Sequence, residues 1–392
     1  MAPAMTRLLR TPLTLATFAV LALALGVALV ALMPSAQGRP QPAAPSGGVT
    51  GARAAGTVPP VTHVFVVNIE NKDYEKTWGP DSGAPYLAKR LRSKGVLIDN
   101  YYGTAHHSLG NYLAQISGQG VTRKIQADCT TFADWSGRGV VDPGQYVGQG
   151  CVFPAETPTL AGQLDEAGYS WRGYMEDMTS PCRHPKVDKL DRMQKAEEDD
   201  QYATRHNPFV YFHSIIDRPK YCAAHVVDLS QLGHDLEQVR STRSLSYITP
   251  DLCSDGHDAP CIDGRPGGLK SINAWMKAWI PQILASPAFR KDGMLIITAD
   301  ESDGVASDSS ACCGEVAGPN ADQPGIEGPG GGRVGALVIS RWTRPGTSSA
   351  TAYNHYALLG SLEDVFGLPY LGFAAADGLT KFGADVYNDY TP

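Results

Sequence analysis

The sequence predicts an α/β fold, a three-layer αβα sandwich with a mostly parallel central sheet. Short apolar runs alternate with amphipathic segments along the chain, and no internal repeat appears at the periods typical of solenoids. Helices between apolar strands imply a parallel sheet that is covered on both faces. Such sheets carry their chemistry outside the carboxyl ends of their strands. We therefore look for functional residues where the strands end.

Six apolar runs are predicted to be strands, and four amphipathic segments are predicted to be helices. The strands are Val64–Ile69, Gly95–Asp99, Tyr169–Met175, Leu245–Ile248, Met294–Ala299 and Val334–Ile339. The helices are Pro158–Ala167, Leu229–Val239, Gly268–Leu284 and Ala352–Phe366. Two long segments, 119–156 and 302–332, are rich in Gly, Pro and Ser, and loops of that length are usually functional or disordered.

The first 36 residues form an export segment. Arg7 and Arg10 precede an uncharged stretch, 11–33, that is long enough to span a bilayer, so the sequence fits both cleavage near Ala36 and retention as a membrane anchor. Residues 37–60 are rich in Gly, Pro, Ala and Ser and are expected to be a disordered linker. One folded domain is then predicted over 61–392, in a secreted protein or on the outer face of the membrane.

The charge balance argues against nucleic acid as a partner. Lys and Arg total 33 against 40 Asp and Glu, which gives a formal net charge of -7. Binding to a phosphate backbone needs the opposite balance. No nucleic-acid partner is therefore expected.

All eight cysteines follow the export segment, and an even set in an exported chain predicts disulfides. Proximity in sequence predicts the pairs Cys129–Cys151, Cys182–Cys222 and Cys253–Cys261. The remaining two, Cys312 and Cys313, are adjacent, so that a vicinal bridge and separate partners are both open. A zinc-thiolate site is disfavoured because no CxxC pair or matching histidine spacing occurs.

Polar residues follow two of the predicted strands. Glu70 and Asn71 come directly after the first strand, and Asp300 and Glu301 come directly after the Met294–Ala299 strand. Oxygen ligands from two central strands at one edge of a sheet can converge on one divalent cation. Acids and amides also begin many solvated turns. Because both pairs follow the most apolar strands, we favour the metal site.

The segment YYGTAHHSLGNYLAQISG predicts a nucleophile. Apolar residues recur at helical spacing after Ser108, which places this serine at a helix N-terminus, where free N–H groups favour an anion such as phosphate. A hydroxyl there, near a cation, can attack an electrophile. An isolated serine would be read as an N-cap. The neighbours His106, His107 and Asn111 favour the catalytic interpretation.

Two further segments supply polar groups near the same edge. SYITPDLCSDGHDAPC follows a predicted strand and offers Asp255, His257 and Asp258, which suit metal ligation or proton delivery to a leaving group. His355 precedes the last predicted helix, from which it can reach the same strand edge.

Six motifs in this order resemble the bacterial and fungal phosphoesterase family, over roughly residues 61–375. They are VFVVNIENKDY, GTAHHSLGNYLAQISG, RHNPFVYFHSI, SYITPDLCSDGHD, LIITADESDG and HYALLGSLEDVFGLPYLGFA. That family holds secreted acid phosphatases and phospholipases C. The resemblance therefore implies an alkaline-phosphatase-like fold and a hydrolase that acts on phosphoric esters.

The resemblance also implies a role for each matching residue. Ser108 looks like the nucleophile, His106 and Asn111 look like phosphate contacts, and His257 looks like the residue that serves the leaving group. Asp258 and His355 are similar to further contacts of the leaving group or the phosphate. The implied ligands of a divalent cation are Glu70, Asn71, Asp300 and Glu301.

The chain also departs from the family pattern. Many members have Asp-Glu-His-Gly-Gly and a later Asp-His where this chain reads DESDGVASDSSACCGE, which leaves a second metal from that loop in doubt. His107 and Gly110 replace prolines that are common in the nucleophile segment. We interpret His206 as a turn residue and His213 as a weaker candidate for the site.

These residues predict an exported, metal-dependent phosphoesterase that hydrolyses phosphate monoesters through a phosphoserine. The expected partner is a phosphorylated small molecule or a phospholipid headgroup. One alternative is a phospholipase C or another phosphodiesterase. Another, from a different class, is a surface-displayed binding protein without catalysis, which bound metal and a response to chelator would exclude.

Overall fold

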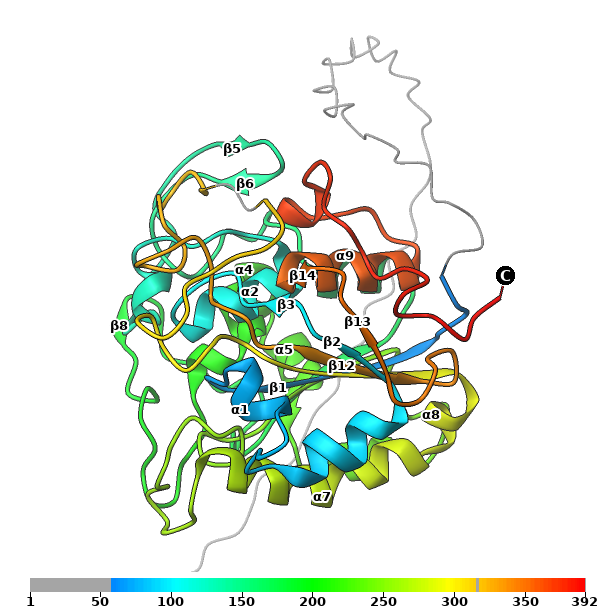
Figure 1. Cartoon of the computed structure of the whole chain (residues 1–392). Coiled ribbons are helices and arrows are strands. Elements are labelled where there is room, and N and C mark those ends of the chain that lie inside the picture. The colour runs from blue at the N-terminus through cyan, green and yellow to red at the C-terminus, as the bar shows by residue number, and fades with distance from the viewer. Residues whose placement is uncertain (1–57, 315–316, 392) are drawn as a thin grey trace, which may run out of the picture. The chain divides into compact units, whose positions relative to one another are not determined.

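An eight-stranded sheet lies at the centre of the computed structural model, which describes residues 58–314 and 317–391 (Figure 1). The strand order is β13-β2-β12-β11-β1-β10-β7-β9. The strands are β1 (His63–Ile69), β2 (Val96–Ile98), β7 (Trp171–Met175), β9 (Val226–Asp228), β10 (Leu245–Thr249), β11 (Gly293–Ala299), β12 (Ala336–Ser340) and β13 (Thr347–Ser349). Only the pairings of β12, with β11 and β2, are antiparallel. The mostly parallel sheet that the sequence predicts is confirmed.

The central strands are buried on both faces. Every residue of β1, β10 and β11 is buried. Nearly continuous apolar runs are typical of parallel strands with helices on either side, because no face meets water. All six predicted strands are present, with ends that shift by one or two residues. Strands β9 and β13 were not predicted, because each is three residues long and too short to show a period.

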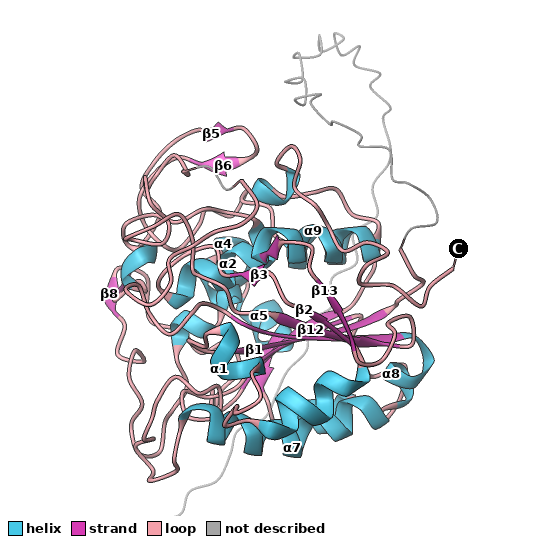
Figure 2. Ribbon diagram, viewed as in Figure 1, coloured by secondary structure: helices cyan, strands magenta, loops and turns pink. Residues whose placement is uncertain are grey.

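Helices cover both faces of the sheet (Figure 2). The α-helices are α1 (Tyr74–Trp78), α2 (Ser108–Ser117), α3 (Leu160–Glu166), α4 (His213–Ile216), α5 (Pro219–His225), α6 (Gln231–Asp235), α7 (Gly268–Ala285), α8 (Pro287–Asp292) and α9 (His355–Phe366). Helices α7 and α8 lie on one face, and α2 and α9 lie together on the other. This arrangement gives the three layers that the sequence predicts.

The predicted helix Leu229–Val239 is wrong in length, since only α6 forms there. The hydroxyls of Ser241 and Thr242 donate to the carbonyl of Asp235 at 3.0 and 2.9 Å. They satisfy a carbonyl that a continuing helix would have bonded to its own backbone. Gly233 lowers the helix propensity of the same segment.

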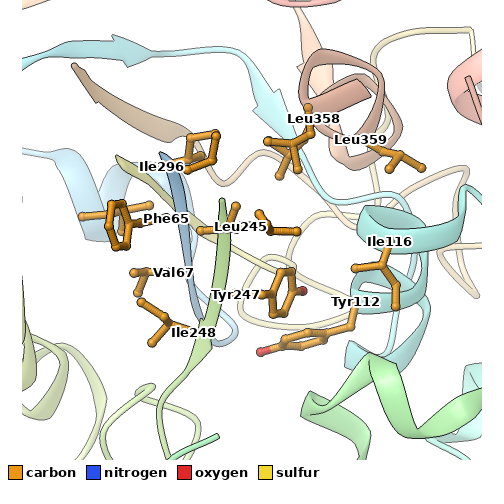
Figure 3. Packing of buried hydrophobic residues seen from close by; sticks show 14 of the residues in the cluster. Phe65, Val67, Tyr112, Ile116, Leu245, Tyr247, Ile248, Ile296, Leu358 and Leu359 are labelled. Atoms are coloured by element: carbon orange, nitrogen blue, oxygen red, sulfur yellow. The ribbon is translucent and has the colours of Figure 1, made fainter. Parts of the chain in front are cut away.

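The core is split by the sheet into two halves (Figure 3). Phe65 and Val67 of β1 point to one face, where the Phe65 ring lies 6.3 Å from that of Phe289 in α8. Tyr247 of β10 points to the other face, toward Tyr112 of α2. Alternation along each strand produces this division. The second half of the core supports the helix that begins at Ser108.

Short strands and disulfides order the loops. The small strands form three pairs, β3 (Tyr101–Tyr102) with β14 (Tyr353–Asn354), β4 (Thr131–Phe132) with β8 (Lys189–Leu190), and β5 (Val140–Val141) with β6 (Gln145–Tyr146). The three predicted disulfides are confirmed, and the fourth joins the adjacent Cys312 and Cys313.

The export segment predicted over 1–36 lies outside the described residues, as does all but the last part of the linker predicted over 37–60. Among the residues that are described, no helix has both the length and the apolar character needed to cross a membrane.

Candidate active site

The carboxyl ends of three parallel strands bring the predicted residues together. The β1 and β11 register places Ile69 beside Ala299, so that Glu70 and Asp300 follow at the same level. The amide of Asn71 donates to Asp300 Oδ1 at 3.0 Å, and the amide of Glu70 donates to the carbonyl of Asp255 at 2.9 Å. Asp255 lies in the loop after β10. The loops after all three strands therefore meet at one edge of the sheet.

Three carboxylates and one imidazole form what we call the strand-end cluster: Glu70, Asp255, Asp300 and His206. Each carboxylate residue is fully buried, and His206 is 2% exposed. His206 lies with Nε2 3.4 Å from Glu70 Oε2 and Nδ1 3.1 Å from Asp255 Oδ2. Possible ligand atoms of Glu70, His206 and Asp255 all lie within 4.8 Å of one another. His206 lies between Glu70 and Asp255, and the buried Lys72 interacts with all three carboxylates through its charge.

Burial and mutual repulsion dominate the electrostatics of the strand-end cluster. Burial raises the pKa of Glu70 well above its usual value, and the charges of Asp300 and Asp255 raise it further. Burial likewise raises the pKa of Asp255, and it raises the pKa of Asp300 to about 6. The same desolvation lowers the pKa of His206, which favours a neutral ring. Burial and crowding thus make the charged form of each of these carboxylates unfavourable.

Ser108 is the first residue of α2 and faces this cluster. Its hydroxyl donates to Glu70 Oε2 at 2.8 Å, and the Tyr112 hydroxyl, one turn further along α2, donates to the other oxygen of Glu70. The helix N-terminus is capped from outside, because Asp128 Oδ1 accepts from the amide of Leu109 at 3.0 Å. The structure therefore joins Ser108 directly to a predicted metal ligand.

Asn111 braces the turn that precedes Ser108. Its Oδ1 accepts from the amides of Thr104 and Ala105 at 2.8 and 3.0 Å, and its Nδ2 donates to the carbonyl of Ala105 at 2.9 Å. Next to it, Gly110 packs where a Cβ would lie 2.5 Å from a methyl group of Val121. The side chain predicted to contact phosphate thus bonds here to the backbone that presents the nucleophile.

His106, two residues before Ser108, is paired with Glu301. The His106 ring contacts the Glu301 carboxylate through Nδ1 and the carbonyl of Asp308 through Nε2, the latter at 3.0 Å. Both side chains are buried. The predicted phosphate contact and the predicted metal ligand therefore form a pair, and this pair anchors the 302–332 loop.

His257 and Asp258 lie at the edge of the site, and both side chains are partly exposed. His257 Nδ1 donates to Asp258 Oδ1 at 2.8 Å, because its Nε2 accepts from the guanidinium of Arg205 at 3.0 Å. The His257 ring centre is 5.9 Å from that of His206. As placed, His257 presents an acceptor rather than a proton at Nε2.

His355 lies beneath the site and contacts it through backbone. Its Nε2 donates to the carbonyl of Asp300 at 2.6 Å, while Nδ1 accepts from the Tyr101 hydroxyl at 3.0 Å and from Gln115 Nε2 at 3.2 Å. Gln115 Oε1 in turn accepts from the Tyr247 hydroxyl at 2.9 Å. We call these four side chains the His355 network. His355 thus positions the loop that carries Asp300.

Sequence reasoning missed three residues of this site. His206, interpreted only as a turn residue, belongs to the strand-end cluster, and Arg205 beside it contacts His257. Both residues belong to the motif RHNPF, which is part of the family resemblance, but the sequence suggested no role in the site for either of them. Lys72 Nζ donates to the carbonyls of Asn71 and Gly256 at 2.8 and 3.0 Å, which ties the loops after β1 and β10 together. His213 pairs with Asp134 and Asp217 instead.

Curated relatives of this chain include phosphatases. It is 23% identical over 308 residues to a probable acid phosphatase of Kluyveromyces lactis, covering 79% of this chain and 59% of that protein. It is 25% identical over 321 residues to a phosphatidylinositol-3-phosphatase of Mycobacterium tuberculosis, covering 82% of each. The chain spans between 55% and 64% of the length of the fungal acid phosphatases that it matches.

Among solved structures, a Vibrio parahaemolyticus protein of the alkaline phosphatase superfamily is 12% identical, with a TM-score of 0.47, over 81% of this chain and 71% of that one. The sequence model of the phosphoesterase family matches residues 81–369, which include Ser108, His257 and Asp300. Because the match extends over most of the 392 residues, the chain belongs to the phosphoesterase family.

Proposed function

We propose that this protein is an exported, metal-dependent phosphoesterase that hydrolyses phosphate monoesters through a phosphoserine. One observation carries the proposal: the Ser108 hydroxyl donates to Glu70 inside a buried group of like charges, the strand-end cluster. Membership of the phosphoesterase family and the phosphatase relatives support the substrate class. The disulfides fit an oxidising compartment, which supports export.

The donor set of the strand-end cluster fits a divalent cation. Among the described residues, buried Asp300 Oδ2 has no hydrogen-bond partner, and the neighbouring carboxylates repel one another. Oxygen ligands with one imidazole suit magnesium, calcium, manganese or zinc. The residues that would hold the cation are Glu70, Asp255, Asp300 and His206, with Asn71 and Glu301 beside them. A bound cation would lower the pKa of a nearby hydroxyl and stabilise negative charge.

The chain's own groups carry the proposed steps. The Ser108 hydroxyl passes its proton to Glu70, to which it already donates, and its oxygen forms a bond to phosphorus as the bond to the leaving oxygen breaks. His257 is assigned to protonate the leaving oxygen once its ring is charged and has turned away from Arg205. Water then attacks the phosphoserine and returns a proton to His257, the bond between the serine oxygen and phosphorus breaks, and the serine oxygen regains its proton from Glu70.

Replacement of the nucleophile tests this proposal. In Ser108→Ala, turnover of a chromogenic phosphate monoester should fall by about 10³-fold or more, because the substitution removes the hydroxyl that is proposed to attack phosphorus. The matched control is Ser117→Ala at the far end of the same helix, where the hydroxyl donates to the carbonyl of Leu113. Full turnover in Ser108→Ala would rule out the assignment.

Metal dependence is tested separately. Dialysis against chelator should abolish turnover, and restored divalent cation should recover it. A purified protein with no bound divalent ion and no response to chelator would support a non-catalytic binding protein instead.

A phospholipid headgroup is a second candidate substrate. The relative from Mycobacterium tuberculosis is described as a phosphatidylinositol-3-phosphatase and covers 82% of this chain. Turnover should therefore be compared among a soluble monoester, a phosphoinositide monoester in vesicles, and phosphatidylcholine. Preferential cleavage of phosphatidylcholine would favour a phospholipase C.

A further inference from the structure

Next to His257 lies a buried positive charge, that of Arg205, which has no role in the reaction steps proposed above. The Arg205 side chain is only 4% exposed. Its Nη1 donates to the carbonyl of Gln194 at 2.6 Å, and its Nη2 donates to His257 Nε2 at 3.0 Å. Both of these partners are neutral acceptors. Neither of these hydrogen bonds of the guanidinium therefore goes to a negatively charged group.

Asp128 is the one carboxylate that forms an ion pair with Arg205 among the described residues, and the pair is loose. Asp128 Oδ2 lies 3.7 Å from Arg205 Nε, beyond hydrogen-bond length. The other oxygen of Asp128 is occupied by the amide of Leu109. A buried charge without a close counter-ion is costly, so its retention is typical of a functional position.

Two series of contacts link Arg205 to the nucleophile. On one side, Asp128 links it to Leu109, the neighbour of Ser108 in α2. On the other side, the contacts run through the two histidines to the carboxylate that accepts from the serine hydroxyl. The members of this ring are Ser108, Glu70, His206, His257, Arg205, Asp128 and Leu109. Arg205 is the only member with a permanent positive charge.

We propose that Arg205 binds the non-bridging oxygens of the substrate phosphate, and that Asp128 holds the guanidinium in place between turnovers. A guanidinium matches two phosphate oxygens in a bidentate geometry that an ammonium cannot reproduce. Phosphate would also take over the Nη2 donor, which would free His257 Nε2 for the leaving group. This inference rests on the proposed function, which identifies the anion as phosphate. The carboxylates of the strand-end cluster alone would repel such an anion.

The alternative is that Arg205 has a structural role only, in which it holds Gln194 and the loop of His257. The two roles predict different affinities for phosphate when Arg205 is replaced. A structural arginine supports folding and does not change the affinity of the folded protein for phosphate.

Binding of inorganic phosphate to the Ser108→Ala protein distinguishes them, measured by calorimetry with one divalent cation at constant concentration. Added to this background, Arg205→Gln should weaken binding by about tenfold or more, and Arg205→Lys should weaken it less. The matched control is Arg183→Gln, because Arg183 forms its ion pair with Asp200 away from the ring. Unchanged affinity in Arg205→Gln, with a lower Tm, would overturn the proposal.

A second variant gives an answer even if Arg205→Gln fails to fold. Asp128→Asn keeps an oxygen for the amide of Leu109 but removes the charge that competes with phosphate for Arg205. Phosphate should then bind about two- to fivefold more tightly. Unchanged or weaker binding would contradict the proposed competition. These measurements need no turnover, so an inactive wild-type protein that binds phosphate through Arg205 would refute the proposed reaction and leave this inference standing.

Discussion

Two buried polar layers lie against each other in this protein, and they are built on opposite principles. The strand-end cluster gathers like charges whose pKa values burial and repulsion raise. The His355 network directly beneath it consists of neutral groups that bond to one another. Burial lowers the pKa of His355 to about 4, which keeps its ring uncharged at neutral pH. The difference teaches that this fold concentrates electrostatic cost in the strand-end cluster and removes that cost from the supporting layer.

Removal of one charge from the strand-end cluster is expected to have the largest effect, and in opposite directions for activity and stability. Asp300→Asn keeps an acceptor for the amide of Asn71 but deletes a repelling charge. Turnover should fall by about 10³-fold, whereas the cation-free protein should gain about 1 kcal/mol in unfolding free energy.

The measurements are monoester hydrolysis and thermal unfolding in chelator. Asp217→Asn serves as the control, because that side chain is 62% exposed and lies outside the cluster. If the cation-free Asp300→Asn protein unfolds more easily than the wild type, the strand-end cluster stabilises the folded state by itself. The contrast between this cluster and the His355 network would then be wrong.

Loss of a hydrogen-bonding partner in the His355 network should mainly lower the free energy of unfolding. His355→Leu leaves the carbonyl of Asp300 and the Tyr101 hydroxyl without their bonds, which should lower the unfolding free energy by about 2–4 kcal/mol. His355→Gln should recover part of this loss, because an amide can both donate and accept. Denaturant titration provides the measurement, with exposed His234→Leu as the control, where a change within about 0.5 kcal/mol is expected. Equal stability of His355→Leu and wild type would show that the network does not support the site.

The smallest effect is expected from a buried carboxyl far from the cluster, Glu363 in α9. Burial raises its pKa well above the usual value, while the amide of Leu371 and the nearby Lys381 lower it. The folded state thus binds more protons than the unfolded state, and this group's contribution to stability falls as pH rises above the unfolded pKa. Glu363→Gln should raise Tm by about 2 °C at pH 8 and change it little at pH 4. A Tm difference that shrinks with rising pH would contradict this sign.

The strand-end residues could be predicted from the sequence because the signal is local. Glu70 and Asp300 each follow a long buried strand, and parallel strands bring their carboxyl ends to the same edge. The three non-vicinal disulfides were also predictable, since taking the cysteines two by two in chain order gives each pair. The roles of Asn111 and His355 were less accessible. Their residue types suggest substrate contacts, whereas the structure shows both bonding to the backbone that presents Ser108 and Asp300.

Other features depended on contacts between distant parts of the chain. His206 lies in a short 3-10 helix, Thr204–His206, whose local sequence has no feature that points its ring toward Glu70, 136 positions earlier. The role of Arg205 could not be predicted from the sequence either, because it depends on which acidic side chains lie near the guanidinium in the folded protein. Only the folded chain shows that Asp128, the ion-pair partner of Arg205 among the described residues, lies 3.7 Å away and also accepts from the amide of Leu109.

By itself, the sequence determined six of the eight strands of the central sheet, the layer architecture, three disulfides and the kinds of groups that end the central strands, because hydrophobic period and residue type act over a few neighbours. The tertiary structure alone decided which of these groups touch, which are neutral, and where a charge remains uncompensated. The physical reason is that desolvation and Coulomb energy depend on distance in space and on burial, and neither quantity exists until the chain has folded.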